Sequence, residues 1–267
     1  MPELPEVEVV RRGLEPFVIG RTFRAVDVLH PRANRGQIGT LSTHLVGRTV
    51  KTVRRRGKFL WLEFHGHEDV LLIHLGMSGQ LRIGETNSHH VRVSSLLDDD
   101  TQLSFVDQRT FGYWRVQDLS HIAHIAKDPL DPDFDLDFVA SKLARKSVPI
   151  KAALLDQTVA SGIGNIYADE ALWQAQIHPL VPANKLGRGD IDKLYRAAAE
   201  VMVKALAVGG TSFDALYVHV NGESGYFARN LHAYGRADTP CDRCAAPIKK
   251  IKIQGRSSHY CPQCQHP

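Results

Sequence analysis

The chain has 267 residues, of which 43% are hydrophobic and 23% are charged. This length fits one large or two modest domains, and it can bury a core without disulfides. No apolar run approaches the ~20 residues that span a bilayer, and the first six residues lack the basic and apolar segments of a signal peptide. These features argue against a membrane protein, and we expect a soluble, cytoplasmic one.

The net charge of +4 is concentrated near the C-terminal end. From Cys241 to Pro267 five basic side chains stand against one acid, Asp242, whereas the preceding residues balance. A concentrated basic segment points to a polyanion, with nucleic acid first, although a solubilising tail explains the charge equally well.

A helix followed by short strands is predicted for the first half of the chain. Val7, Val10, Leu14 and Val18 recur at helical spacing, with Pro5 in the first turn. Segments with strand character then alternate with turn signals, which is typical of a β-sandwich or barrel. The predicted strands are Arg24–Val28, Thr49–Val53, Phe59–Phe64, Val70–Leu75, Val91–Leu97 and Thr101–Val106.

Helices are predicted for much of the second half. Asp128–Asp137 holds five aspartates and two prolines, which indicates a solvated linker and a domain boundary. An apolar stripe from Ile191 to Ala205 predicts a long helix, with Asp190 as its N-cap and Gly209 as its stop. Two further helices are expected to flank the segment 161–165, where two glycines allow a tight reversal.

All four cysteines lie in the basic segment. Cys241 and Cys244 form one pair with two residues between them, and Cys261 and Cys264 form another sixteen residues later. This spacing predicts a structural four-cysteine zinc site. The intervening residues suit a two-stranded ribbon that turns near 254–256. Two disulfides are the alternative, which the lack of an export signal makes less favourable.

The N-terminal residues suggest covalent chemistry. Removal of the initiator methionine would expose Pro2, a secondary amine, and an α-amino group with a pKa near ~8 is partly unprotonated at neutral pH. Such an amine can attack a sugar carbon and form an iminium, with Glu3 beside it as an acid or base and Glu6 one turn further on. An ordinary helix start explains the same residues.

Five motifs occur in an order that resembles the formamidopyrimidine-DNA glycosylase family, bacterial base-excision repair enzymes for oxidised purines. The resemblance covers essentially the whole chain. The motifs are the segments 2–8, 74–79, 107–112 and 162–167 and the four-cysteine finger.

The resemblance implies an α+β fold. It has an N-terminal helix and β-sandwich in a catalytic domain over residues 1–127, and a linker over 128–149. A helical helix-two-turn-helix DNA-binding domain over 150–236 and a zinc finger over 237–267 follow.

The resemblance also implies a bifunctional enzyme that flips an oxidised base out of duplex DNA and then cleaves the strand. Pro2 would attack C1′ of the sugar, and Glu3 would assist as general acid and base. Lys58 matches the lysine assigned to β-elimination, although an ammonium group could equally clamp a phosphate. Arg256 matches the arginine linked to δ-elimination, and it would also grip a phosphate.

Further matched positions imply DNA contacts. Asn165, at a helix start, and the basic residues Lys146 and Lys151 match groups that face the DNA backbone. His74 and His90 match DNA-contacting histidines, although a lone histidine is more often structural. Met77, Arg109 and Phe111 resemble side chains that fill the gap left by the extruded nucleotide. The alternative for the apolar Met77 and Phe111 is that they are core residues.

The resemblance implies further features, and the sequence departs from the family pattern at two positions. The loop Val218–Tyr226 resembles a flap over the flipped base, and the implied partners are one zinc ion and damaged double-stranded DNA at the nucleoid. A monomer is implied. Gln108 and Thr110 replace a proline and an arginine common in the family, which puts a neighbouring phosphate contact in doubt. The alternatives are an endonuclease VIII-like glycosylase for oxidised pyrimidines and a non-catalytic zinc protein that binds DNA.

Overall fold

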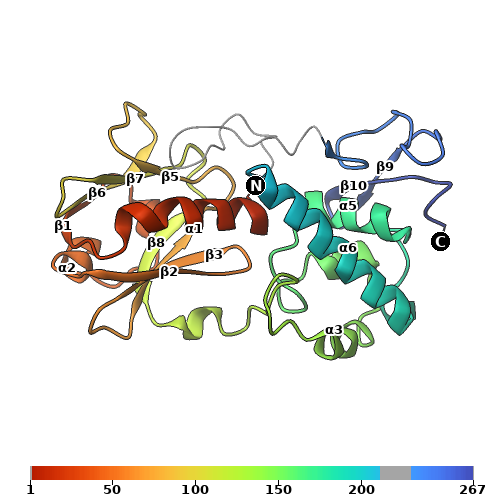
Figure 1. Ribbon diagram of the computed structural model, residues 1–267, viewed down its shortest axis with the longest axis horizontal. Coiled ribbons are helices and arrows are strands. Elements are labelled where there is room, and N and C mark those ends of the chain that lie inside the picture. Colours follow the sequence, from red (N-terminus) through yellow and green to blue (C-terminus); the bar gives the residue numbers. More distant parts are fainter. Residues whose placement is uncertain (1, 211–229, 267) are drawn as a thin grey trace. The chain divides into compact units, whose positions relative to one another are not determined.

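The computed structural model in Figure 1 describes residues 2–210 and 230–266. These residues divide into two compact units. The first contains residues 2–124 and 208–210, and the second contains residues 125–207 and 230–266. No helix in these described ranges is long and apolar enough to cross a membrane.

The first unit begins with helix α1 (Leu4–Val18), at the position that the apolar spacing predicts. Pro5 lies in the first turn, where a missing N–H costs no hydrogen bond. One face of the helix is buried and joins the core of the unit. The residues of this helix in the core are Val7, Val10, Leu14 and Val18.

Two antiparallel four-stranded sheets follow. One has the order β1 (Phe23–Val28), β6 (Val91–Leu97), β7 (Gln102–Val106) and β5 (Gln80–Ile83). The other has the order β2 (Val50–Arg56), β3 (Phe59–Phe64), β4 (Val70–His74) and β8 (Tyr113–Gln117). Residues of both sheets share one buried core, which confirms the predicted β-sandwich.

Short elements connect these strands. They are η1 (Pro31–Asn34), α2 (Leu41–Leu45) and η2 (Leu119–Ile122). The six predicted strands all form, whereas β5 and β8 are not among them. Both are short, with four and five residues, and each contains an arginine and a glutamine.

The second unit is mostly helical. Its helices are α3 (Leu136–Leu143), α4 (Ile150–Leu154), α5 (Asn165–Ala175) and α6 (Arg188–Ala207), with η3 (Ala183–Lys185) before the last. Helix α5 is buried on nearly all sides and packs against α6. The predicted N-cap of α6 is wrong, because the helix begins at Arg188 and Asp190 lies in its first turn. Gly209 follows its end with φ 80°, as a stop signal should.

The aspartate-rich segment is folded. Asp135 caps α3, because its side chain accepts hydrogen bonds from the N–H groups of Asp137 and Phe138. Asp128, at the start of the segment, is buried. Val139 and Leu143 are buried on the inner face of α3, which packs against α6. The segment 128–137 is therefore more ordered than a free linker, because its aspartates cap α3 and form turns, although Asp133, Asp135 and Asp137 are exposed to solvent as their charge predicts.

The C-terminal residues form the predicted two-stranded ribbon. Strands β9 (Lys249–Ile253) and β10 (Arg256–Tyr260) pair antiparallel. Gln254 and Gly255 connect them with φ of 46° and 82°, the left-handed pair that a tight hairpin turn requires.

Helix α5 supports the ribbon from within the second unit. The buried carboxylate of Glu170 accepts the N–H groups of His232, Ala233 and Tyr234 at 2.8–2.9 Å. Trp173 packs in a small apolar cluster with two of the cysteines. The ribbon therefore belongs to the same folded body as the helices.

Candidate active site and nucleic-acid interface

The start of α1 is buried. Glu3 and Glu6 are each 2% exposed, and Pro2 is also buried. The Glu3 N–H donates to Glu6 Oε2 at 2.8 Å, and the two residues form a reciprocal capping box. Gly210 lies so close that a Cβ there would be 3.1 Å from the Glu6 carboxylate. This packing fixes both carboxylates beside Pro2.

Glu8 ties the β2–β3 hairpin to α1. Its carboxylate accepts Arg11 Nε at 2.9 Å, Arg12 Nε at 2.7 Å and Arg55 Nε at 3.1 Å. Burial alone would raise the pKa of Glu8, but the hydrogen bonds from Arg11 and Arg12 and the charge of Arg55 outweigh it and lower the pKa to about 2. In Figure 1 the hairpin turn and the start of α1 lie at the same end of the first unit.

Lys58 lies in that turn, and His74 is close to it. His74 pairs in register with Phe59, and their rings are 4.9 Å apart. Burial, followed by the charges of Lys58 and Arg35, lowers the pKa of His74 to about 4. Its Nδ1 accepts the Gly76 N–H at 3.2 Å, so the neutral ring carries its proton on Nε2. The structure thus places the Lys58 ammonium group near the neutral His74 ring, whose Nε2–H can donate a hydrogen bond.

The loop 107–112, which connects β7 to β8, is organised by the carboxylate of Asp107, which has no exposed surface. Oδ1 accepts the Ser78 hydroxyl at 2.6 Å and the Arg109 N–H at 3.2 Å, and Oδ2 accepts the Gly112 N–H at 2.8 Å. Gly76 and Gly112 let the segment 74–79 approach this loop, because a Cβ on Gly76 would lie 2.5 Å from the Gly112 nitrogen.

This arrangement brings three predicted DNA-contacting side chains together on one surface. Arg109 Nη1 lies 3.9 Å from the sulfur of Met77, and Met77 and Phe111 are 36% and 50% exposed. The alternative that Met77 and Phe111 are core residues therefore does not hold. Half-exposed apolar side chains beside a guanidinium suit a surface that meets a base stack.

His90 lies on the same sandwich. Its Nδ1 is 3.0 Å from Arg92 Nη2, and its ring lies 3.8 Å from that of His89. Together with Ser78, Arg82 and Gln108 it lines a pocket of about 190 Å³. The predicted flap, Val218–Tyr226, lies outside the described residues.

In the second unit, Asn165 and the ribbon are joined directly. The Asn165 side-chain Nδ2 donates to the Ser257 carbonyl at 3.0 Å, and the neighbouring Arg256 is exposed at the hairpin tip. Helix α5 begins at Asn165, and its N-cap, Gly164, has no side chain to cap it. The first turn of α5 and Arg256 therefore form one potential anion-binding surface.

The two predicted lysines differ in exposure. Lys146 is half-buried and pairs with Asp156 at 2.7 Å. Lys151 is 1% exposed, and its Nζ donates to the Asn165 carbonyl at 2.8 Å and to the buried Asp169 at 2.5 Å. Both lysines line a pocket of about 340 Å³ that also includes Arg256. No sequence pattern predicted Asp169 as a partner, since it lies 18 residues from Lys151.

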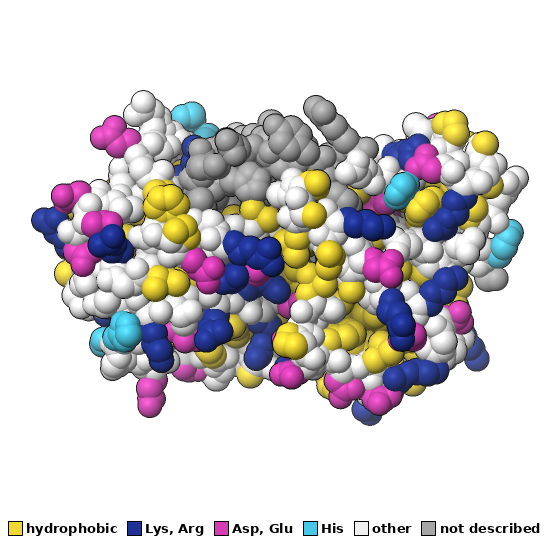
Figure 2. All heavy atoms as spheres, viewed as in Figure 1, with side chains coloured by type: hydrophobic (Ala, Val, Ile, Leu, Met, Phe, Trp, Pro, Cys, Tyr) yellow, Lys and Arg dark blue, Asp and Glu magenta, His cyan; other side chains and the backbone are white. Residues whose placement is uncertain are grey.

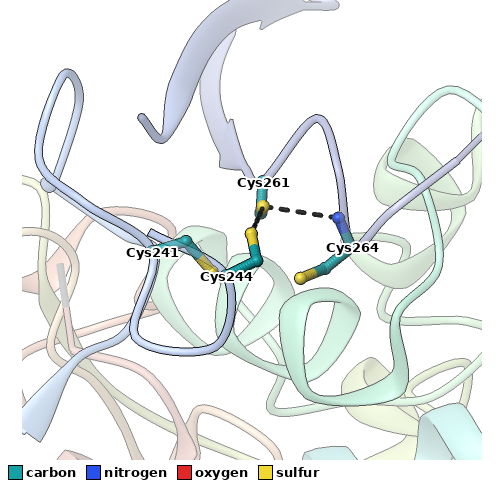
Figure 3. Close-up of side chains that lie close together, drawn as sticks. All are labelled: Cys241, Cys244, Cys261 and Cys264. Carbon is teal, nitrogen blue, oxygen red and sulfur yellow. Dashed lines mark hydrogen bonds between the residues drawn. The ribbon is translucent and has the colours of Figure 1, made fainter. Parts of the chain in front are cut away.

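The four cysteines converge on one centre (Figure 3), and their Sγ atoms all lie within 4.8 Å of one another. Four thiolates around one zinc ion at about 2.3 Å would be about 3.8 Å apart, so the donor set fits a tetrahedral site. Burial and then the neighbouring thiols raise the pKa of Cys264 to about 12, a crowding that a divalent cation relieves.

The surroundings of Cys241 shift the pKa of its thiol in the opposite direction from that of Cys264. Burial alone would raise the pKa of its thiol, but N–H donors, including the Trp173 indole at 3.4 Å, outweigh it and lower the pKa to about 6. These four residues form the site of one structural zinc ion, as the spacing predicts.

Elsewhere the surface is mixed in charge. On the face shown in Figure 2, basic and acidic side chains are interspersed over each unit, which is typical of a surface that faces water. The ribbon differs, because Lys249, Lys250, Lys252 and Arg256 are all exposed on its two strands. The predicted concentration of positive charge therefore lies on a folded element.

Known proteins resemble this chain over its whole length. Residues 1–114 match the model described as the formamidopyrimidine-DNA glycosylase N-terminal domain, and residues 125–216 match the formamidopyrimidine-DNA glycosylase H2TH domain. Residues 239–267 match a zinc finger found in FPG and IleRS. The matches support the predicted helix-two-turn-helix and the zinc site.

Curated relatives and solved structures agree. The formamidopyrimidine-DNA glycosylase of Corynebacterium aurimucosum is 62% identical over 100% of this chain and 96% of its own, and that of Mycobacterium avium is 54% identical over 99% and 98%. A Lactococcus lactis FPG mutant in complex with a Fapy-dG containing DNA has a TM-score of 0.91 at 36% identity, with both chains fully covered. MutM (FPG) from Thermus thermophilus has a TM-score of 0.88 at 37% identity, also with both chains fully covered.

Proposed function

Because this chain belongs to the formamidopyrimidine-DNA glycosylase family, we propose that it excises oxidised purines from duplex DNA and then cleaves the strand at the resulting site. The substrates are 8-oxoguanine and formamidopyrimidines, in line with the Fapy-dG containing DNA bound by the similar Lactococcus lactis protein. It acts as a monomer on the DNA of a bacterial nucleoid. The observation that carries the proposal is the buried start of α1, where Glu3 and Glu6 lie fixed beside Pro2.

Pro2 is the nucleophile of this proposal. Removal of Met1 would free the Pro2 nitrogen as a secondary amine, and an α-amino group with a pKa near ~8 is partly neutral at neutral pH, so it can act as a nucleophile. It attacks C1′ of the damaged nucleotide, the C1′–base bond breaks, and the base leaves with a proton. Opening of the sugar ring then leaves an iminium between Pro2 and C1′. Glu3, fixed by the capping box, moves the protons in these steps.

Strand cleavage follows from the iminium. The positive nitrogen makes the C2′ proton acidic, so its loss expels the 3′ phosphate in a β-elimination. A further elimination then expels the 5′ phosphate. Lys58 is assigned to the first step, and Arg256 holds a phosphate for the second. The neutral His74 beside Lys58 supports this assignment, because its Nε2–H offers a donor to a phosphate oxygen without adding charge.

The remaining DNA contacts divide between the two units. In the first, Arg109 hydrogen-bonds the base left opposite the lesion, and Met77 and Phe111 fill the gap in the stack. His90 contacts the backbone beside them. In the second, Asn165 binds a phosphate at the start of α5. Lys146 and Lys151, which pair with Asp156 and Asp169, line the pocket beside Arg256.

Borohydride trapping tests the proposal. Borohydride reduces an iminium, so the protein should become covalently linked to duplex DNA that carries 8-oxoguanine opposite cytosine. Pro2→Gly should abolish most of the linked product, whereas Pro5→Ala, a change at the neighbouring proline, should leave it. Linked product of undiminished yield in Pro2→Gly would refute the nucleophile. Preferred excision of thymine glycol would refute the substrate class, and DNA binding without any trapping would refute the enzymatic proposal.

A further inference from the structure

A single guanidinium faces the carbonyl side of the loop 107–112. Arg35 Nη2 donates to the Phe111 carbonyl at 2.6 Å, and Nη1 lies 3.3 Å from the Gly112 carbonyl and 3.4 Å from the Thr110 carbonyl. Asp107 holds the N–H groups of the same loop. The loop is therefore fixed on both sides, by an anion at its donors and by a cation at its acceptors.

The loop needs such support, because its own sequence does not favour its shape. Thr110 has φ 55°, a left-handed conformation that a β-branched residue rarely adopts. Phe111, the next residue, is half exposed and gains little from packing. Without external hydrogen bonds, the loop would relax to other backbone conformations.

Arg35 is itself fixed to the sandwich. Its carbonyl accepts Arg115 Nη2 at 2.6 Å and Nε at 3.2 Å, and Gln37 Oε1 accepts the Val116 N–H at 2.7 Å. The guanidinium groups of Arg35 and Arg115 lie 4.9 and 5.1 Å from the centre of the Tyr113 ring. The segment 35–37 is thus attached to strand β8 at several points, and it offers a rigid base for the Arg35 side chain.

We propose that Arg35 is a positioning residue that holds the loop 107–112 in the conformation that presents Arg109 and Phe111 to DNA. It thereby sets how strongly the enzyme distinguishes cytosine from adenine opposite the lesion. The inference rests on the proposed function, in which Arg109 recognises the unpaired base. The planar fork of arginine is essential, because one lysine ammonium cannot hold three carbonyls along a loop.

The test uses the full-length zinc-bound protein and the variants Arg35→Gln and Arg35→Lys. Amide hydrogen exchange of the peptide covering 107–113 reports the loop without reference to activity. Excision of 8-oxoguanine opposite cytosine and opposite adenine, measured as kcat/KM, reports discrimination. The matched control is Arg24→Gln, because Arg24 is another exposed arginine of the sandwich and pairs only with the exposed Asp100 among the contacts described.

Both Arg35 variants should exchange the Arg109 and Gly112 amides at least about tenfold faster and lose about tenfold of the discrimination, while trapping on an abasic site persists. Arg24→Gln should match the wild type. Unchanged exchange and discrimination in Arg35→Gln would overturn the inference, and wild-type behaviour of Arg35→Lys would overturn the role of the fork. Failure of the wild-type protein to trap would instead refute the proposed function, and the exchange measurement would still decide whether Arg35 holds the loop.

Discussion

Two short turns of this protein each present an arginine, and each depends on an aspartate with no exposed surface. Asp107 lies in the loop that it organises and accepts the N–H groups of Arg109 and Gly112. Asp169 lies on helix α5 and holds the ribbon that carries Arg256 from a distance of about 90 residues in the chain.

The difference shows what each turn requires. The loop 107–112 belongs to a sandwich with a large core, and side-chain hydrogen bonds from Asp107 and Arg35 shape it without a metal ion. The ribbon shares only a small apolar cluster, so it needs a metal ion and the hydrogen bonds that Ser258 and His259 donate to the buried Asp169 on α5. The two turns that expose Arg109 and Arg256 are therefore stabilised by different means.

Removal of zinc should produce the largest difference in behaviour between the two turns. Structural zinc contributes about 10–16 kcal/mol to the folding of zinc-finger peptides, so chelation should unfold the ribbon and weaken DNA binding at least about a hundredfold. The loop 107–112 contains no ligand and should keep its hydrogen-exchange protection. Fluorescence anisotropy with duplex DNA, before chelation and after zinc is restored, measures the first effect. Undiminished binding by protein that is proven free of zinc would contradict it.

The two aspartates should differ in their cost to stability. Asp169→Asn leaves the buried Lys151 ammonium without its charge partner, which should lower the free energy of unfolding by about 3–5 kcal/mol. Asp107→Asn removes no ion pair and should cost about 1–3 kcal/mol through its mismatched hydrogen bonds. Denaturant unfolding measures both. The double variant Lys151→Met, Asp169→Asn should recover part of the larger loss, and equal losses in the two single variants would contradict this comparison.

The same contrast explains what the sequence can predict. The cysteine spacing, the apolar face of α1 and the six predicted strands are local patterns, and all three appear in the structure. The motif residues Met77, Arg109 and Phe111 also meet on one surface, because Gly76 and Gly112 let the segments that carry them approach closely.

The supporting residues could not be predicted in this way. Arg35 contacts Phe111 across 76 residues of sequence, and Asp169 contacts His259 across 90. No local spacing marks such a pair, since their proximity exists only after the sheets and helices have packed. Helix α3 was not predicted, because the aspartates that cap its start also resemble those of a solvated linker.

Acid should affect the first unit through His74. Its pKa of about 4 lies below the usual 6.5, so the folded state favours the neutral ring. The stabilisation is complete above pH 6.5 and is lost as the pH falls from about 6.5 to about 4, an effect of about 3 kcal/mol. His74→Gln should remove this part of the pH dependence in denaturant unfolding at several pH values. A variant that loses stability over this range as steeply as the wild type would show that other groups are responsible.

The smallest effect concerns the hydrogen bond from Trp173 to the zinc site. The indole Nε1–H donates to Cys241 Sγ at 3.4 Å, while the ring stacks at 4.4 Å on His232 and lies 3.8 Å beneath the Arg243 guanidinium. Such a donor favours the thiolate that binds the metal. Trp173→Phe keeps an aromatic ring and removes the donor, so it should lower zinc affinity by about tenfold to a hundredfold.

Competition with a coloured chelator measures this affinity. Trp61→Phe is the matched control, because the Trp61 indole donates to Glu63 in the first unit and should not alter zinc binding. If Trp173→Phe and Trp61→Phe bind zinc equally well, the indole only packs against the site. If only Trp173→Phe binds zinc more weakly, then α5 supports the ribbon at both ends, through Asp169 beneath β10 and through Trp173 at the metal.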